Sequence, residues 1–547
     1  MLGSVDTIMS RLCFALLFAS IVSVSAQLSK GNLILIKRGL QVQGMVTRDD
    51  VFHLNTYSNA NYTSIHWLWT SSSQMTAFPW SRWVSNESNM PPVGAEAPYM
   101  SQLVSLQLGD EWNLNDAALR TRAVNWFNLV RSNFPNTILY MNNFGGQVGD
   151  SQLADFWTRA RPDMLCFDTY PWKSDYTTRT PRPGPPTSWY GDLRRYREHA
   201  RDAGVPLGSY VQTFHAVQDY DQTVYRDPSP SELQLNYFGA LAFNAKVLID
   251  FTYNTGASSL FTTPGGDSNP TALLGEKTEI ALRARNFGKA LVRLGPIADA
   301  TRQYTTSMMF LRGRRSDGTL PPVPIGFIAD PQAPNDYTDW VADRNDPYLR
   351  GWTVTNKPAI KNNGRPGDVI ISWLKPLDES FDGPNYSNQV YVMVVNGLTD
   401  PTGSAADCLQ EIRLSFAFPA TITSVDMLNP ANGQIETQLL PIVSTRRQLV
   451  LNLNGGDAAL FKFSTGAPFV GFFPPVAARL NLQMQTNIAA IRIQGTAGAT
   501  YQLQRTAALP SNWFTFASVQ LPSTNHTVFD PKPPNVTRRF YRAIAAP

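Results

Sequence analysis

The chain has 547 residues, of which 43% are hydrophobic, 11% aromatic and only 16% charged. A chain rich in aromatic residues and poor in charge is not disordered, and its composition also excludes collagen and coiled coil. The net charge of +4 is too small and too scattered to predict a nucleic-acid partner. We therefore expect a weakly charged, aromatic surface that suits neutral, hydroxyl-rich ligands.

The N-terminal segment predicts export from the cell. Residues 11–26 read RLCFALLFASIVSVSA, with one arginine, a short apolar run and a small-residue ending before Gln27. This is the pattern of a secretory signal peptide over residues 1–26, and the apolar run is too short to cross a bilayer. No later stretch approaches 18 uninterrupted apolar residues, so we expect no membrane span and an extracellular or periplasmic location.

Cysteine and histidine give no indication of a metal site or a disulfide scaffold. Beyond the predicted signal peptide only Cys166 and Cys408 remain, in segments that we assign to different domains. The five histidines show no HExxH motif or comparable ligand spacing. There is also no GxGxxG after the first predicted strand and no Walker A sequence. The sequence predicts neither a metal nor another cofactor.

Residues 27–302 alternate short apolar runs with amphipathic helical stretches, which predicts a parallel (β/α)8 barrel. Proline or glycine lies at the predicted helix boundaries, as at Pro230, Pro162 and Gly204. The predicted helices are Asp116–Asn133, Ser151–Arg161, Trp189–Ala203 and Ser231–Phe243. The predicted strands are Gly39–Val46, Tyr62–Trp69, Leu103–Glu111, Thr137–Phe144, Asp163–Trp172, Val205–Phe214, Lys246–Tyr253 and a short Ser258–Thr262.

After the barrel the helical periodicity disappears. Short strands separated by Gly, Pro, Asn and Asp predict an antiparallel β-sandwich over residues 303–465. Residues 466–475 (GAPFVGFFPP) are predicted to form a linker, and residues 476–547 a small C-terminal all-β module. The predicted sandwich strands are Val390–Asn396, Ile412–Phe416, Ile422–Met427, Gln448–Leu453 and Ala458–Phe463.

Two acidic residues are predicted at the barrel mouth, where the carboxyl ends of the strands meet. Alternation along Leu103–Glu111 turns Glu111 into the lumen and turns Asp110 away, while alternation along Asp163–Trp172 turns Asp168 inward. Two carboxyl groups at neighbouring strand ends are what glycoside hydrolysis requires. We predict Glu111 as general acid or acid/base and Asp168 as its partner.

Further polar and aromatic side chains follow the predicted strands and are candidates for sugar contacts. A carboxylate after a strand is also a common helix cap, and a tryptophan there is also a common core residue. Asp250 lies between Ile249 and Phe251 and is a candidate structural carboxylate as well. The predicted substrate-binding residues are Asp110, Trp69, Trp112, Asn143, Tyr170, Trp172, Gln212, Asp250 and Tyr253.

The strings LQLGDEWNL and, about 55 residues later, CFDTYPW resemble strand ends of secreted barrel glycoside hydrolases of the broad β-galactosidase-like superfamily. Those enzymes usually have a β-sandwich after the barrel, and NGGDAALFKF is similar to the last strand of such sandwiches. The resemblance implies a (β/α)8 barrel enzyme that hydrolyses glycosidic bonds of a neutral oligo- or polysaccharide.

The sequence departs from the usual pattern of that superfamily, which has Asn-Glu at the fourth strand and Glu at the seventh. Here Asp110 replaces the asparagine, and Val205–Phe214, the best match for the seventh strand, offers Gln212 and no acid. Three alternatives remain: Asp168 as the partner, an inverting mechanism, or a degenerate barrel that binds glycan without cutting it. The last alternative predicts no second acid within about 10 Å of Glu111. A structural envelope protein is a further alternative.

The C-terminal module resembles small β modules appended to secreted bacterial enzymes, especially planctomycete and verrucomicrobial ones. The resemblance rests on YQLQRT, SNWF and RRFYRA. It implies attachment to a cell surface or to glycan through this module.

Overall fold

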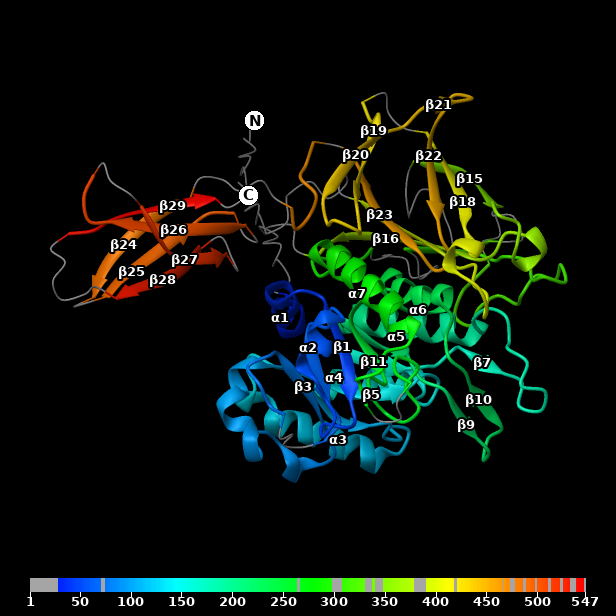
Figure 1. Ribbon diagram of the computed structural model, residues 1–547, viewed down its shortest axis with the longest axis horizontal. Coiled ribbons are helices and arrows are strands. Elements are labelled where there is room, and N and C mark those ends of the chain that lie inside the picture. The colour runs from blue at the N-terminus through cyan, green and yellow to red at the C-terminus, as the bar shows by residue number, and fades with distance from the viewer. Residues whose placement is uncertain are drawn as a thin grey trace, which may run out of the picture.

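The computed structural model (Figure 1) describes the chain in segments. They are residues 28–69, 74–262, 266–297, 307–329, 337–339, 348–377, 390–417, 421–464, 466–472, 478–485, 488–496, 499–509, 513–521, 525–531 and 538–545. The predicted signal peptide lies outside the described residues. No helix in these segments is long and apolar enough to cross a membrane.

The first domain is a closed barrel of eight parallel strands, which confirms the predicted fold class. Around the barrel the order is β1-β11-β8-β6-β5-β4-β3-β2, so β1 and β11 close the ring. The strands are β1 (Gln41–Val46), β2 (Ser64–Trp67), β3 (Trp80–Val84), β4 (Leu103–Asp110), β5 (Ile138–Phe144), β6 (Leu165–Asp168), β8 (Leu207–Gln212) and β11 (Ala245–Phe251).

One of the eight strands differs from the prediction. The strand Trp80–Val84 completes the barrel between β2 and β4. By contrast, the predicted Ser258–Thr262 forms only isolated bridges, from Ser258 to Phe214 and from Phe261 to Pro270. A short strand with tryptophan at both its first and fourth positions does not show a clear polar–apolar alternation, and within the described residues no α-helix separates it from its neighbours.

The barrel helices begin and end at recognisable capping residues. Asp116 accepts hydrogen bonds from the first backbone N–H groups of α3, and Ser229 and Glu232 form a capping box around Pro230 at the start of α6. The connection between β3 and β4 contains only the 3-10 turns η1 (Glu87–Asn89) and η2 (Gly94–Gln102). The helices are α1 (Lys30–Arg38), α2 (Leu54–Asn59), α3 (Ala117–Val130), α4 (Asp150–Ala160), α5 (Thr187–Ala203), α6 (Pro230–Ala242) and α7 (Ala272–Leu291).

The second domain consists of two antiparallel sheets around their own apolar core. The larger sheet has the order β14-β13-β16-β17-β23-β19-β20, with β12 (Leu294–Pro296) paired to β16, and the smaller has the order β15-β18-β22-β21. Their strands are β13 (Met308–Leu311), β14 (Tyr337–Thr338), β15 (Leu349–Asn356), β16 (Val369–Pro376), β17 (Tyr391–Asn396), β18 (Gln410–Phe416), β19 (Ser424–Leu428), β20 (Ile435–Leu439), β21 (Ile442–Val443), β22 (Arg446–Leu453) and β23 (Ala458–Phe463).

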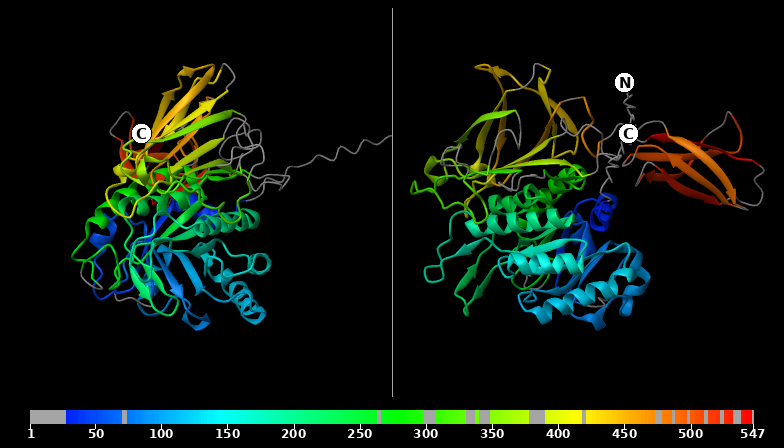
Figure 2. Two further views of the ribbon diagram at one scale, coloured as in Figure 1. Left: turned by 90° about the vertical axis from the view of Figure 1, so that its right-hand side faces the viewer. Right: turned by 180° about the vertical axis from the view of Figure 1, so that it is seen from behind.

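One face of the larger sandwich sheet packs into the apolar cluster of the barrel, separately from the sandwich's own core. Helix α6 contacts strands β16 and β17, and sandwich residues such as Met393 and Leu460 belong to the same buried cluster as the barrel interior. Arg283 of α7 also forms an ion pair with Asp457. Figure 2 shows the sandwich seated on helices of the barrel in both views.

The C-terminal module stands to one side of these two domains (Figures 1 and 2). It contains two three-stranded antiparallel sheets, β24-β25-β28 and β27-β26-β29. Among its described residues, the buried members of its apolar core cluster are few, namely Ile493, Tyr501, Leu503 and Leu521. The strands are β24 (Arg479–Gln485), β25 (Ile488–Gln494), β26 (Thr500–Thr506), β27 (Phe514–Gln520), β28 (Asn525–Pro531) and β29 (Phe540–Ala545).

Candidate active site

The end of β4 contains a backbone irregularity that positions two acidic residues. The pairing of β4 with β5 shifts register between Gln107 and Asp110. Gly109 has a φ of +76° and Glu111 a φ of +49°, both in the region where a side chain is strained and glycine is not. The regular alternation used for the prediction therefore stops at Gly109.

Asp110 consequently does not turn away from the lumen, and that expectation was wrong. Its carboxylate accepts hydrogen bonds from Gln107 Nε2 (2.8 Å) and Asn142 Nδ2 (3.0 Å). Asn142 Nδ2 also donates to Asp168 Oδ1 at 3.1 Å, so one amide joins the acids at the ends of β4 and β6.

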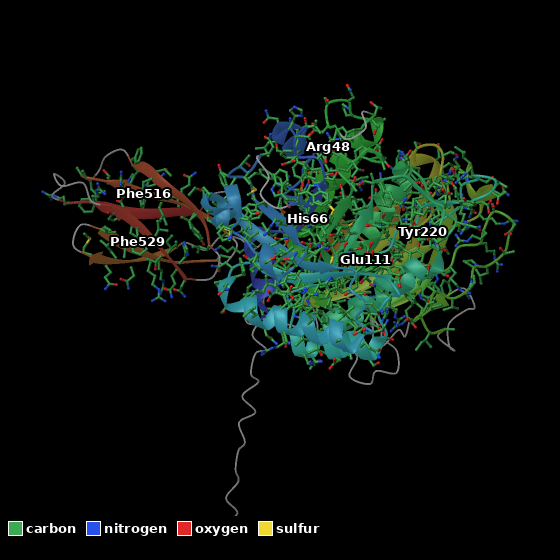
Figure 3. All side chains as sticks on the ribbon, turned by 90° about the horizontal axis from the view of Figure 1, so that it is seen from below. Arg48, His66, Glu111, Tyr220, Phe516 and Phe529 are labelled. Atoms are coloured by element: carbon green, nitrogen blue, oxygen red, sulfur yellow. The ribbon has the colours of Figure 1, made fainter. Side chains whose placement is uncertain are left out.

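Glu111 completes the cluster. Its carboxyl group is hydrogen-bonded to that of Asp168. The Glu111 side chain is exposed, whereas Asp168 is only 7% exposed. The backbone of Glu111 is fixed on both sides, because its N–H donates to the Asn142 carbonyl and its own carbonyl accepts from Gln147 Nε2. Figure 3 shows Glu111 over the barrel, seen from below the view of Figure 1.

The electrostatics of this carboxyl cluster (Asp110, Glu111 and Asp168) separate the protonation states of its members. Burial, followed by the nearby charges of Glu111 and Asp110, raises the pKa of Asp168 well above its usual value. The pKa of Asp110 rises to about 6, because surrounding protein atoms desolvate its carboxyl group and Glu111 lies beside it. The raised pKa of Asp168 therefore favours a protonated carboxyl group within the cluster.

The lumen beneath the cluster is polar and aromatic. Gln107 Oε1 accepts a hydrogen bond from the Tyr210 hydroxyl at 2.5 Å, which fixes the amide that donates to Asp110. His66 of β2 is fully buried, its ring centre is 6.4 Å from that of Tyr210, and burial lowers its pKa to about 3. Among the described residues neither ring nitrogen of His66 has a hydrogen-bond partner. This histidine is therefore neutral.

Tyr170 is the predicted aromatic residue that lies against the carboxyl cluster. The charges of Asp168, Asp110 and Glu111 all raise its pKa, after burial as the largest cause. Its ring stacks on Phe251 at 5.7 Å and meets Phe214 edge-on at 4.9 Å. Trp69, after β2, is 55% exposed, and its indole N–H donates to the Thr47 carbonyl.

The remaining predicted contact residues do not face the carboxyl cluster. Asn143 and Trp112 contact each other next to it. Asn143, next to Asn142, donates to the Trp112 carbonyl at 3.4 Å. The Trp112 ring packs on Trp126 of α3, with the Arg122 guanidinium 4.9 Å from its centre. On β5 the functional amide is therefore Asn142, one residue before the predicted one. Strand alternation applied to β5 as it was to β4 would have found it.

Trp172 and Gln212 are both completely buried. Gln212 Oε1 accepts from the Trp172 backbone N–H at 2.9 Å, and its Nε2 donates to the carbonyls of Trp172 and Arg226. The Trp172 ring packs near Trp189 of α5. The two residues join the loops after β6 and β8, and neither presents an accessible surface to a ligand.

Asp250 and Tyr253 are also completely buried. Asp250 pairs with Val211 of β8 and comes directly before Phe251, whose ring stacks on Tyr170. Because side chains alternate along a strand, the Asp250 side chain is on the opposite, helix side of β11. There it accepts from the hydroxyls of Tyr62 (2.6 Å) and Tyr237 (2.5 Å). The Tyr253 hydroxyl donates to the buried Asp267 at 2.9 Å. The prediction that these two residues contact substrate at the mouth was wrong.

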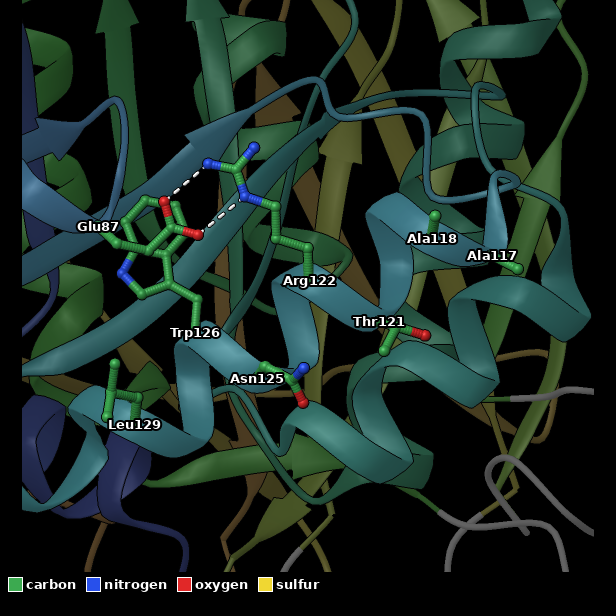
Figure 4. Close-up of a pocket in the computed structure, with 8 residues that line it drawn as sticks. All are labelled: Glu87, Ala117, Ala118, Thr121, Arg122, Asn125, Trp126 and Leu129. Atoms are coloured by element: carbon green, nitrogen blue, oxygen red, sulfur yellow. Dashed lines mark hydrogen bonds and ion pairs between the residues drawn. The ribbon is translucent and has the colours of Figure 1, made fainter.

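An open groove of about 650 Å³ lies on the outer face of α3 (Figure 4). The Arg122 guanidinium forms two hydrogen bonds with the Glu87 carboxylate at one side, and Leu129 is exposed at the other. The groove is lined by Glu87, Ala117, Ala118, Thr121, Arg122, Asn125, Trp126 and Leu129. No member of the carboxyl cluster lines it. In the described part of the chain, no group of three or more His, Cys, Asp or Glu is arranged to hold a metal ion.

No protein-family model and no curated protein matches the chain. Among solved structures, it is similar to a glycoside hydrolase family 5 protein from Bacteroides vulgatus, with 10% identity, a TM-score of 0.35, and coverage of 78% of this chain and 90% of that one. It is also similar to α-galactosidase I from Mortierella vinacea, with 9% identity, a TM-score of 0.34, and coverage of 78% and 98%. At these scores, the evidence on function comes from the side chains at the barrel mouth.

Proposed function

We propose that this protein is a secreted glycoside hydrolase that cleaves bonds of a neutral oligo- or polysaccharide with the carboxyl cluster. The observation that supports this most is the hydrogen-bonded pair of Asp168 and Glu111, one buried with a raised pKa and one exposed. Two-carboxylate glycoside hydrolysis needs a proton donor and a second carboxyl group at one site, and the raised pKa of Asp168 favours a proton on this pair.

In the proposed reaction the pair holds one proton, which lies between the two carboxyl groups. Glu111, the exposed member, takes this proton and donates it to the glycosidic oxygen as the bond to the anomeric carbon breaks. Asp168 is then ionised and stabilises the positive charge that develops on the sugar, and water finally adds to the anomeric carbon. The proton released by that water restores the pair.

The surroundings of the pair support its role. Asn142 and Gln107 hold Asp110 and Asp168 in place through neutral amides, which add no positive charge to the cluster. Tyr170 and Phe251 provide an aromatic wall beside it. Aromatic rings and amides suit the flat faces and hydroxyl groups of neutral sugars.

Two carboxyl groups in hydrogen-bonding contact are closer than the roughly 5–5.5 Å of retaining enzymes or the 6.5–9.5 Å of inverting ones. Cleavage therefore requires Glu111 to swing outward around the sugar. Its exposed side chain permits this, while Asp168 stays held by Asn142. The alternative, a degenerate barrel that only binds glycan, predicts no acid near Glu111. The contact with Asp168 counts against it.

A glycan-panel hydrolysis screen tests the proposal by comparing the wild type with Glu111→Gln. We expect the wild type to release sugar from at least one glycan, and Glu111→Gln to lose about 10²–10⁴-fold in kcat while it still binds that glycan. Glu279→Gln makes the same chemical change on the exposed face of α7 and is the matched control. Equal rates for Glu111→Gln and the wild type would remove Glu111 from the mechanism. Binding without hydrolysis by the wild type would favour the alternative.

A further inference from the structure

The positive charge of the chain is concentrated in the C-terminal module, contrary to the scattered distribution expected from the total. Residues 476–547 contain seven lysines and arginines and a single acidic residue, Asp530. The rest of the chain therefore has slightly more acidic than basic residues. A module of this charge is attracted to polyanions, whereas the barrel mouth is acidic.

The module uses part of its positive charge internally. Arg505 and Arg539 form ion pairs with the buried Asp530. Arg542 donates to Gln504 and lies 4.3 Å above the Trp513 ring. By contrast, Arg479 and Arg492 are exposed, and neither has a hydrogen-bond or ion-pair partner among the described residues.

Arg479 and Arg492 lie on the same outer face of the sheet β24-β25-β28. Leu480, Ile493 and Val528 turn inward to the module core, so the residues that alternate with them turn outward. The strand register places Arg479 opposite Gln494, and Arg492 opposite both Asn481 and Thr527. The two arginines are thus diagonal neighbours, about 7–8 Å apart.

The rest of this outer face is polar and aromatic. The next row along the strands contains Gln483, Ala490 and Phe529, and Phe529 is 57% exposed (Figure 3). The outer face has no acidic side chain among its described residues. Arginine forks bind carboxylates with two hydrogen bonds, amides bind hydroxyl groups, and an exposed ring packs on the face of a sugar.

We propose that the outer face of β24-β25-β28 binds an acidic polysaccharide, a chain of sugars that bear carboxylate groups. The two free arginines would bind its carboxylates, the surrounding amides its hydroxyl groups, and Phe529 one sugar ring. Amide rows around the arginines favour a hydroxyl-rich chain over a lipid surface, where a continuous apolar face is needed. This binding site is separate from the carboxyl cluster and does not depend on hydrolysis there.

The test measures binding of the full chain to polygalacturonate by affinity gel electrophoresis and calorimetry, in the Glu111→Gln background so that hydrolysis plays no part. We expect binding to polygalacturonate that weakens as salt rises, and no binding to uncharged dextran. The double variant Arg479→Gln/Arg492→Gln should lose at least about tenfold in affinity, and Phe529→Ala a few-fold.

Arg542→Gln removes the same charge from the other sheet and is the matched control, with an expected affinity close to that of the parent. Thermal unfolding of every variant checks that the module remains folded. The proposal is overturned if polygalacturonate does not bind, or if Arg542→Gln weakens binding as much as the double variant does. Tighter binding to duplex DNA or to vesicles of 30% anionic phospholipid would also overturn it.

Discussion

Two buried aspartates near the ends of barrel strands have opposite surroundings. Asp250 on β11 accepts hydrogen bonds from two tyrosines and has the Lys277 ammonium 3.8 Å away. Among the described residues, Asp168 on β6 has one amide donor and two other carboxyl groups as neighbours. One carboxyl group is satisfied and closed off by helices, while the other is held in an unfavourable environment at the barrel mouth. Partners, more than position in the sequence, distinguish a structural carboxylate from one that we propose to act in catalysis.

Asp168→Asn removes the carboxyl group that we propose to act in catalysis, and it has the largest expected effect. Without the shared proton, kcat should fall by about 10²–10⁴-fold. The pKa of Asp168 is higher in the folded protein than in the unfolded chain, so above about pH 4 the folded protein keeps a proton that the unfolded chain loses. The free energy of unfolding therefore decreases as pH rises from about 4. The variant should therefore melt about 2–4 °C higher at pH 7 and gain less at pH 4.

To check this prediction, kcat is measured on a glycan that the wild type cleaves, and the melting temperature is measured by calorimetry at pH 7 and pH 4. A lower melting temperature at pH 7 would show that Asp168 stabilises the fold, as Asp250 is expected to.

Asp250→Ala tests whether the Asp250 carboxylate has a structural role. It leaves Lys277 buried without its partner, and we expect a loss of about 3 kcal/mol in the free energy of unfolding. This is the low end for a broken buried pair, because burial already lowers the pKa of Lys277 to about 7, so the lysine can lose its proton. Urea unfolding measures the loss, and kcat per folded molecule should stay unchanged.

A second substitution, Lys277→Met, should recover part of that loss by removing the unpaired ammonium group. A fall in kcat at full folding would instead place Asp250 in the reaction.

Asp110→Asn has the smallest expected effect and sharpens the comparison within the carboxyl cluster. The negative charge of Asp110 helps to raise the pKa of Asp168. Its removal should therefore lower that pKa and move the alkaline limb of the kcat–pH profile to lower pH. Asparagine keeps nearly the same size, so KM should change little. An unchanged alkaline limb would mean that Asp110 does not influence the shared proton.

The sequence predicted most of the barrel because strand–helix alternation is a local signal. It missed Trp80–Val84, where no α-helix of the described segments marks the boundaries and tryptophans obscure the alternation. The pairing of Glu111 with Asp168 followed from period-two alternation, which holds along β6. The same rule misplaced Asp110, because the register shift at Gly109 depends on pairing with β5. The surroundings of Asp250 come from α6, α7 and Tyr62 just before β2, and Tyr62 and α7 are distant in sequence.

The irregular end of β4 also changes how many functional groups one strand supplies. A regular strand presents one side chain to a barrel lumen for every two residues, so a site that needs several acids must recruit several strands. Here adjacent residues, Asp110 and Glu111, reach the same site from one strand. Their relative position is set by a single peptide unit and not by the spacing between strands. Small changes in barrel shape would therefore move both acids together relative to Asp168, which a different strand positions.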